Sequence, residues 1–267
     1  MPTCYRHPTR ETGVACSSCG RPICTDCMTP TTVGMRCPEC SRQRTRVHRV
    51  RANEVQAPVA TYAIIAVNVV AYLAELATGS GFGNVGGTVY AKGALWGPLV
   101  SPGGEWWRLI TSGFLHVSLW HIAANMLFVF FIGRSLEPAI GSARLVVAYM
   151  ASLLCGSLGV LLLDPNAITV GASGAAFGLL GALMAEARSR GISLWSTGLI
   201  QVAAFNFLFT LAIPHISLGA HLGGFVGGIL VGVVFDQADR RRLPRAASLT
   251  AGTALGVVAF VLSLAVA

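Results

Sequence analysis

Charged residues are scarce in this chain of 267 residues: Asp, Glu, Lys and Arg together make up only 11% of it. A typical soluble domain contains about 25%, so the chain lacks the polar surface that would keep its apolar mass in water. Lysine occurs once, at Lys92, and cysteine occurs once after residue 40, at Cys155. This composition excludes a disordered chain, a collagen-like repeat and a disulfide-stapled secreted mini-protein.

Apolar residues, by contrast, make up 54% of the chain, and from residue 56 onward they form long segments. A helix needs about 20 residues to cross a bilayer core about 30 Å thick. We therefore expect an all-α polytopic membrane protein. The seven candidate segments are about 58–77, 120–138, 144–163, 172–187, 195–213, 217–235 and 247–267, the short fourth one being completed by 185–190.

Basic residues occupy alternate loops, which predicts the orientation of the chain. The long loop 79–119 contains only Lys92 and Arg108, whereas other loops are rich in arginine. Because cytoplasmic loops carry the excess of Lys and Arg, we expect a cytoplasmic N-terminus and an external 79–119 loop. The arginines of the predicted inner loops are Arg42, Arg44, Arg46, Arg49, Arg51, Arg134, Arg144, Arg188, Arg190, Arg240, Arg241, Arg242 and Arg245.

The formal charge of +8 is concentrated at the N-terminal end, with about half of the positive charge before residue 52. It is therefore not a nucleic-acid footprint, and we expect no nucleic-acid partner. Residues 42–57 read as a basic juxtamembrane linker, either a plain topology signal or a segment that contacts anionic membrane lipids. The Arg-rich, Lys-poor, Ala/Gly/Val-rich composition hints at a high-GC bacterium, and hence at a bacterial plasma membrane.

Residues 1–41 contain eight potential metal ligands arranged as four close pairs. Eight such donors are what two tetrahedral Zn²⁺ sites require. A segment of this size with few large apolar side chains cannot build a core, so metal would supply most of its folding free energy. Disulfides are the alternative, but a cytoplasmic location disfavours them. The pairs are Cys4 and His7, Cys16 and Cys19, Cys24 and Cys27, and Cys37 and Cys40.

The order of these pairs resembles B-box and RING-type fingers. That resemblance implies a cross-brace, in which the first pair shares a metal with the third and the second with the fourth. A sequential arrangement would use the same ligands. Because no open coordination position is implied, we expect a structural module that binds a cytoplasmic protein partner or regulates the rest of the chain.

Polar residues inside predicted spans are costly and mark candidate functional sites. The second, fourth and sixth segments all run from outside to inside, so their N-terminal ends share one depth. His121 and Asn125 lie one turn apart in segment two, Ser173 begins segment four, and His221 lies about 6 Å below the start of segment six. These four side chains are therefore predicted to occupy one layer near the outer face.

This set of side chains matches the needs of serine catalysis. Ser173 offers a nucleophile and His221 a neutral base. His121, Asn125 and the backbone N–H of Ser173, at the positive end of its helix, offer donors for an oxyanion. No carboxylate lies at this depth in these three segments, so we predict a dyad whose histidine is oriented by packing. Small residues four apart allow the close helix approach that this requires: Gly174, Gly178, Gly181, Ala220, Gly224 and Gly228.

With these residues and their spacing, the segment from about 58 to 236 resembles the rhomboid family of intramembrane serine proteases. Several motifs in the right order carry the resemblance. They are Trp107-Arg108, His116, His121-x3-Asn125, Gly133-x2-Leu136-Glu137, Gly171-Ala172-Ser173-Gly174, Asn206, the turn at 214–217, and Ala220-His221-x2-Gly224-x3-Gly228.

The resemblance implies a six-helix protease domain at 58–236, with residues 237–267 adding a basic loop and a seventh helix. It implies that Ser173 is the nucleophile, that His221 is the base, and that His121, Asn125 and the Ser173 amide form the oxyanion site. Single-pass membrane proteins would be cut near the extracytoplasmic face, with no cofactor for catalysis. His116 and Arg108 would be structural or would position the loop, Glu137 would hold the inner end of segment two, and segment five, with Phe205 and Asn206, would correspond to a gating helix.

One departure concerns Phe177, four residues after Ser173, where some members have Tyr; an aromatic ring can still pack on His221. Three alternatives remain open. A catalytically silent relative would bind membrane proteins without cutting them, although such relatives typically lose the Ser or the His. A transporter would show charged residues within spans and inverted repeats, but Glu75 is the main acidic candidate and no repeat is evident. A metalloprotease built on His116, His121, His215 and His221 would lack any H-E-x-x-H motif.

Overall fold

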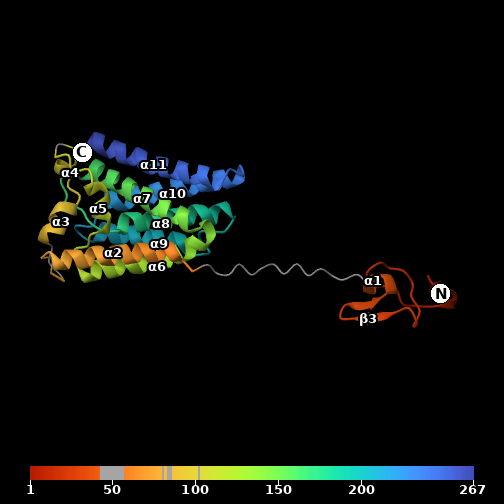
Figure 1. Cartoon of the computed structure of the whole chain (residues 1–267). Helices are drawn as coiled ribbons and strands as arrows, with labels where there is room; N and C mark the ends of the chain where they lie inside the picture. The colour runs from red at the N-terminus through yellow and green to blue at the C-terminus, as the bar shows by residue number, and fades with distance from the viewer. Residues whose placement is uncertain (43–56, 80, 83–85, 102) are drawn as a thin grey trace. The chain divides into compact units, whose positions relative to one another are not determined.

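The computed structural model describes residues 1–42, 57–79, 81–82, 86–101 and 103–267. The chain separates into two compact units, Met1–Glu54 and Val55–Ala267, each of which is described by itself (Figure 1). Most of the predicted linker, with Arg44, Arg46, Arg49 and Arg51, lies outside the described residues. Its contact with lipid therefore stays a prediction.

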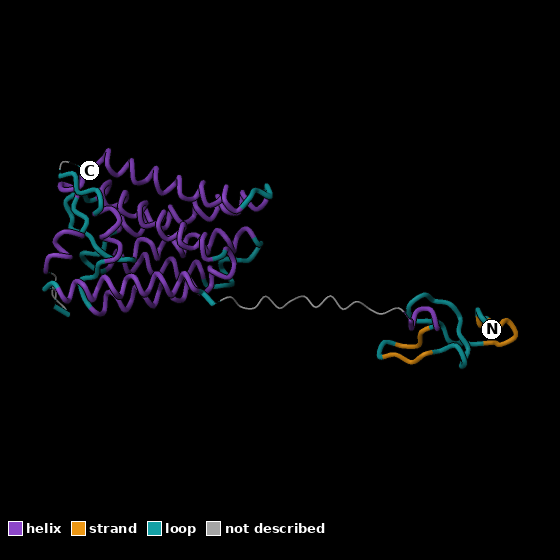
Figure 2. The backbone as a smooth tube through the Cα atoms, in the orientation of Figure 1, coloured by secondary structure: helices purple, strands orange, loops and turns teal. Residues whose placement is uncertain are grey.

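The N-terminal unit is built from very short elements. Strands β1 (Thr3–Cys4) and β2 (His7–Glu11) form one antiparallel pair, β3 (Thr29–Thr31) and β4 (Gly34–Arg36) form another, and α1 (Pro38–Arg42) follows (Figure 2). Its buried cluster consists of Ile23 and six cysteines. The centre of the unit is therefore filled by cysteine sulfurs. This is the composition expected of a unit that is too small to build a core from apolar side chains.

A helix overlaps each of the seven predicted segments in the second unit. Five of these helices are long and apolar enough to cross a membrane, whereas α8 has 17 residues and α9 has 14. The protein is thus a mostly helical integral membrane protein. The seven helices are α2 (Val59–Ala77), α6 (Leu119–Ile140), α7 (Ser142–Leu163), α8 (Ser173–Ser189), α9 (Leu199–Ala212), α10 (Leu218–Arg240) and α11 (Arg245–Val266) (Figure 1).

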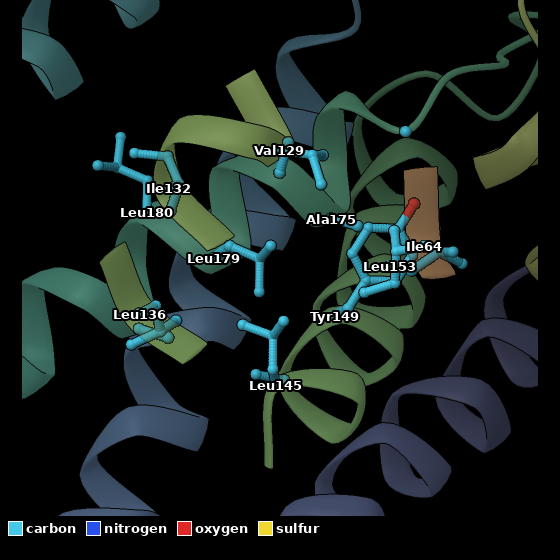
Figure 3. Close-up of a cluster of buried hydrophobic side chains, with 14 of the residues drawn as sticks. Ile64, Val129, Ile132, Leu136, Leu145, Tyr149, Leu153, Ala175, Leu179 and Leu180 are labelled. Carbon is cyan, nitrogen blue, oxygen red and sulfur yellow. The ribbon is translucent and has the colours of Figure 1, made fainter. Parts of the chain in front are cut away.

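Helix α8 lies in the interior of the bundle and packs against α6, α7 and α10. Its residues from Gly174 to Ala182 are all buried, so its surroundings are mostly protein rather than lipid. A helix in that position needs neither the length nor the continuous apolarity of a lipid-facing span. The core around it includes Val129 and Leu136 of α6 and Leu145 and Tyr149 of α7 (Figure 3).

The backbones of α8 and α10 touch, because glycines line their contact. A Cβ atom added to Gly224 would lie 2.0 Å from the carbonyl oxygen of Gly174. Likewise, a Cβ atom on Gly223 would lie 2.3 Å from the carbonyl oxygen of Cys155 on α7. Any side chain at these positions would force the helices apart. The predicted role of the small residues in close helix approach is therefore visible in the structure.

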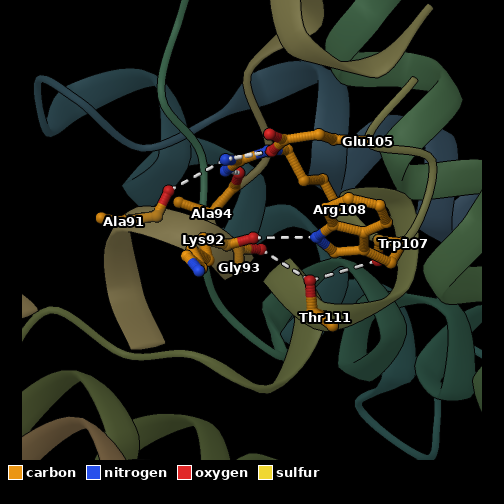
Figure 4. Close-up of polar contacts among 8 residues, drawn as sticks. All are labelled: Ala91, Lys92, Gly93, Ala94, Glu105, Trp107, Arg108 and Thr111. Carbon is orange, nitrogen blue, oxygen red and sulfur yellow. Dashed lines mark hydrogen bonds and ion pairs between the residues drawn. The ribbon is translucent and has the colours of Figure 1, made fainter. Parts of the chain in front are cut away.

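The loop 79–119 contains short helices, namely α3 (Gly87–Gly93), α4 (Gly97–Val100), α5 (Arg108–Thr111) and the 3₁₀ helix η1 (Ser112–Phe114). Arg108 is 4% exposed. Its guanidinium donates to the carbonyls of Ala94 (2.6 Å) and Ala91 (3.0 Å) and pairs with Glu105 at 2.5 Å (Figure 4). Arg108 thereby holds the loop together, in line with the positioning role that the resemblance implied.

Glu137 joins α6 to the beginning of α2. Its carboxylate accepts the backbone N–H groups of Ala60 and Thr61, both at 2.8 Å, and the Thr61 hydroxyl at 2.7 Å. The residue before α2, Pro58, provides no side-chain cap. Glu137 therefore satisfies orphan N–H groups at the α2 N-terminus from a neighbouring helix, which ties the C-terminal part of α6 to the start of α2.

Candidate active site

The hydroxyl of Ser173 and the imidazole of His221 meet at the start of two helices. Ser173 is the first residue of α8, and His221 lies in the first turn of α10, which Ser217 caps by accepting the Ala220 N–H. The Nε2 atom of His221 is 2.8 Å from Oγ of Ser173. This is hydrogen-bonding distance between a hydroxyl and an imidazole from separate helices, the arrangement that a serine nucleophile and its base would need.

Phe177 fixes the plane of the His221 ring. It lies one turn after Ser173 on α8, and its ring stacks on the imidazole with centroids 4.0 Å apart and planes 15° from parallel. Phe207 of α9 and Phe128 of α6 pack against Phe177 in turn, with centroids 5.1 and 6.0 Å away. Packing thus orients the imidazole, and Phe fills the place that Tyr has in some rhomboids.

A second contact to His221 was missed by the sequence reasoning. Thr210 of α9 is 4% exposed, and its Oγ lies 2.6 Å from Nδ1 of His221. The expectation that packing alone orients His221 was therefore incomplete. The predicted layer was built from segments two, four and six alone. Helix α9 runs antiparallel to α8 and α10, so its C-terminal end reaches the same depth, and Thr210 could have been found there.

His121 and Asn125 lie beside the segment that leads into Ser173. A Cβ atom added to Gly171 would be 2.9 Å from Nε2 of His121 and 3.6 Å from Nδ2 of Asn125. Asn125 is 7% exposed, and its buried Nδ2 has no hydrogen-bond partner among the described residues. A buried N–H donor of this kind is costly unless something else accepts it. The arrangement leaves a donor available for an oxyanion next to the N-terminus of α8.

The loop 79–119 holds the segment before Ser173 in place. The N–H of Gly171 donates to the carbonyl of Ser112 (2.9 Å), and Leu95 and Thr169 exchange two backbone hydrogen bonds. Gly171 has φ +131°, a conformation that a side chain disfavours. The glycine therefore allows both the turn into α8 and the close approach of His121.

His116 supports the site from the loop. Its ring meets the ring of His121 edge to face, with centroids 5.1 Å apart, and its backbone N–H donates to the Glu75 carboxylate at 3.0 Å. Burial lowers the pKa of His116 to about 3, so the ring is neutral. His116 packs against His121 as a structural residue, and Glu75 anchors the loop to α2.

A family comparison covers this region. The family model for the rhomboid domain matches residues 103–237, which include Ser173, His221, His121 and Asn125. The chain belongs to the rhomboid family.

Relatives among curated proteins carry the family name. RHOMBOID-like protein 1 of Arabidopsis thaliana is 41% identical over 156 residues, 55% of this chain and 39% of that protein. Rhomboid protease GluP of Bacillus subtilis is 34% identical over 193 residues, 71% of this chain and 36% of that protein. Putative rhomboid protease YdcA of the same bacterium is 35% identical over 143 residues, 52% of this chain and 72% of that protein. The chain thus spans well under half the length of the first two.

The rhomboid match does not include the N-terminal unit, whose ligands form two groups. Cys4, His7, Cys24 and Cys27 form one, and Cys16, Cys19, Cys37 and Cys40 the other; within each, the ligand atoms lie within 4.8 Å of one another. The first pair thus lies with the third and the second with the fourth, the grouping that the cross-brace resemblance implied.

The spacing of the sulfurs fits a tetrahedral metal. Ligands 2.3 Å from Zn²⁺ are separated by about 3.8 Å along the edge of a tetrahedron. Sγ of Cys19 lies 3.8 Å from Sγ of Cys37, and Nδ1 of His7 lies 3.3 and 3.4 Å from the sulfurs of Cys24 and Cys27. A disulfide would require about 2.05 Å, and all the cysteines are free. The backbone N–H of Cys37 donates to Sγ of Cys16, and this hydrogen bond is the main cause that lowers the pKa of the Cys16 thiol to about 6.

Proposed function

We propose that this protein is an intramembrane serine endopeptidase that cleaves single-pass membrane proteins near the extracytoplasmic face. The observation that carries the proposal is the 2.8 Å contact between Ser173 Oγ and His221 Nε2. Membership of the rhomboid family supports it, as do relatives named as rhomboid proteases. A single Ser or His in a membrane helix, without the other beside it, would not support a catalytic role.

In the proposed reaction, Oγ of Ser173 attacks the carbonyl carbon of the scissile peptide bond while His221 Nε2 accepts the hydroxyl proton. The backbone N–H of Ser173 and side-chain N–H groups of His121 and Asn125 stabilise the oxyanion of the tetrahedral intermediate. The C–N bond then breaks as His221 returns the proton to the leaving amine. Water attacks the acyl-enzyme with His221 again as base, which releases the second product and restores Ser173.

The side of the membrane that the Ser173–His221 site faces is inferred from the arginines of the connecting loops, which lie at the opposite end of the helix bundle. Arg190 donates to the Ala139 carbonyl at the end of α6, and Arg240 to the Ser189 carbonyl at the end of α8. The C-terminal ends of α6 and α8 therefore share one side with these arginines, while Ser173 begins α8 at the other side. Because arginine-rich loops face the cytoplasm, the proposed site faces outward. A bacterial plasma membrane with the N-terminus inside remains our proposed location.

For the N-terminal unit we propose two structural Zn²⁺ ions, held by the two ligand groups described above. Bound metal would supply the cross-links that fold a segment with so small an apolar core. With four protein ligands at each site, no position is left for substrate. We propose that the folded module contacts a cytoplasmic protein rather than taking part in peptide hydrolysis.

A catalytically silent relative is the alternative, and several relatives are named only as rhomboid-like. The test uses the purified full chain in liposomes with a panel of single-pass membrane proteins. Wild type is expected to cleave at least one of them, and both Ser173→Ala and His221→Ala to abolish cleavage while leaving thermal unfolding unchanged. Ser135→Ala is the matched control, because Ser135 is exposed and bonds only its own helix. Cleavage by Ser173→Ala at the wild-type rate would refute the assignment.

A further inference from the structure

Thr210 is the one polar side chain that α9 buries. Of the 14 residues of α9, only Ala203 and Thr210 are buried, while Phe205, Leu208 and Leu211 are more than 60% exposed. The buried hydroxyl makes two contacts: 2.6 Å to Nδ1 of His221 and 2.8 Å to the carbonyl oxygen of Asn206, one turn earlier on α9. A buried hydroxyl with two partners is well placed to fix the position of a proton.

The contacts among Ser173, His221, Thr210 and the Asn206 carbonyl favour one arrangement of their protons. The Ser173 hydroxyl contacts His221 Nε2, and a neutral imidazole carries its proton on one nitrogen only. If Ser173 donates to Nε2, the proton of His221 is on Nδ1 and is donated to Thr210, whose own hydroxyl proton goes to the Asn206 carbonyl. Each proton in this series of hydrogen bonds, from Ser173 to the Asn206 carbonyl, then has an acceptor. In the opposite direction Nε2–H would point at Ser173, and the Asn206 carbonyl would lose its contact with the hydroxyl.

We infer that Thr210 is a positioning residue for His221, taking the place that a carboxylate has in a Ser-His-Asp triad. This inference rests on the proposed function. The Thr210 hydroxyl holds His221 in the tautomer whose Nε2 lone pair faces Ser173. It also accepts the Nδ1–H of the imidazolium that forms when Ser173 loses its proton. The Thr210 hydroxyl contacts His221 and not Ser173, so its proposed role is to act through His221.

Loss of the Thr210 hydroxyl should change kcat and KM differently. Removing the hydroxyl leaves a buried Nδ1–H without an acceptor, which disfavours both the productive tautomer and the imidazolium. Because Thr210 is buried and, within the described part of the chain, its hydroxyl contacts only His221 and the Asn206 carbonyl, we expect kcat to fall and KM to stay unchanged. An isosteric valine removes the hydroxyl while keeping the shape, and a serine restores the hydroxyl without the methyl group.

The experiment compares wild type, Thr210→Val, Thr210→Ser and Ser173→Ala as full chains in liposomes, cleaving the same single-pass substrate. We expect Thr210→Val to lower kcat about tenfold with KM changed less than about twofold, and Thr210→Ser to recover kcat to within about twofold of wild type. The control is Thr250→Val, since the Thr250 hydroxyl makes the same bond one turn back, to Ala246, on the exposed face of α11; its kcat should equal that of wild type.

Two results would overturn the inference: a wild-type kcat in Thr210→Val, or equal losses in Thr210→Val and Thr210→Ser. If Thr210→Val folds poorly, the rate at which a fluorophosphonate labels Ser173 per folded molecule replaces kcat, and the same tenfold loss and serine recovery are expected. If wild type cleaves no faster than Ser173→Ala, the proposed function itself fails. The failure of the Thr210 role is therefore distinguishable from the failure of the protease proposal.

Discussion

Gly228 of α10 lies so close to α8 that a Cβ atom added to it would be 1.8 Å from the carbonyl oxygen of Gly178. Non-bonded carbon and oxygen atoms cannot come this close, and the obstacle is backbone rather than a side chain that could rotate away. The short distance between the two helices therefore requires a glycine, which has no side-chain carbon, at position 228. The same two helices carry Ser173 and His221 at their N-terminal ends.

Gly228→Ala is expected to push α8 and α10 apart and to lower the free energy of unfolding by about 1–3 kcal/mol. Misplacing the proposed nucleophile from its base by about 1 Å would cost about 10²-fold in cleavage rate. Thermal unfolding in detergent and cleavage in liposomes check both effects. Gly13→Ala is the control, because a Cβ there meets nothing within 4 Å. Unchanged stability and activity in Gly228→Ala would contradict the packing argument.

Glu137→Gln tests the link between α6 and α2. The carboxylate accepts two backbone N–H groups and the hydroxyls of Thr61 and Ser142, whereas an amide presents an N–H₂ group to some of these donors. Hydrogen bonds to a charged group contribute about 1.5–3 kcal/mol, and we expect a loss of that size in the free energy of unfolding. Glu186→Gln, which removes an i,i+4 pair with the half-exposed Arg190, should change stability by less than about 0.5 kcal/mol. Equal effects of the two variants would count against the anchoring role.

Phe177 tests the stack on His221. Phe177→Tyr keeps the ring and should retain wild-type cleavage to within about threefold. Phe177→Ala should destabilise the fold by about 3–5 kcal/mol through the cavity that it creates, and should lower the rate per folded molecule because the imidazole is no longer confined. Phe131→Ala, on the exposed side of α6 at 58% exposure, is the matched control. A folded Phe177→Ala protein with full activity would rule out the orienting role.

Metal analysis of the full chain tests both the zinc content and the pairing of ligands. We expect two Zn²⁺ per chain in wild type and in Cys155→Ala, whose thiol lies in α7 outside both groups. In the cross-brace, Cys4 and Cys24 hold the same ion, so the variant lacking both should retain one Zn²⁺. A sequential arrangement would place them in different sites and leave none. Wild-type protein without bound metal would end the zinc proposal altogether.

The sequence predicted the helices well because their signal is composition over long windows. Residues 58–77 became α2 (Val59–Ala77) and residues 217–235 became α10 (Leu218–Arg240), which is longer than predicted at its C-terminal end. The layer containing Ser173 and His221 followed from topology alone, since helices running the same way share depths. The grouping of the zinc-type ligands came from a resemblance, because ligand spacing alone is compatible with either pairing.

The sequence could not predict contacts made to backbone atoms. Two of the three partners of Arg108 are the carbonyls of Ala91 and Ala94, which carry no signal in the residue types. The depth of Thr210 could have been predicted from topology, but its partner could not. A single threonine in an apolar segment ordinarily bonds its own helix, as Thr210 also does at Asn206. The packing of α9 against α10 shows that the same hydroxyl reaches His221.

Covalent labelling of Ser173 tests the proposed dyad most directly, because it needs no knowledge of the natural substrate. A fluorophosphonate forms a phosphorus–oxygen bond with an activated serine Oγ and releases fluoride. Intact-mass and peptide mass spectrometry of the full chain should find one adduct, on Ser173, in wild type. In His221→Ala, where the hydroxyl remains but its base is gone, labelling should slow by about 10²-fold or more. Equal labelling rates in the two proteins, or an adduct on another serine, would contradict the Ser173–His221 mechanism.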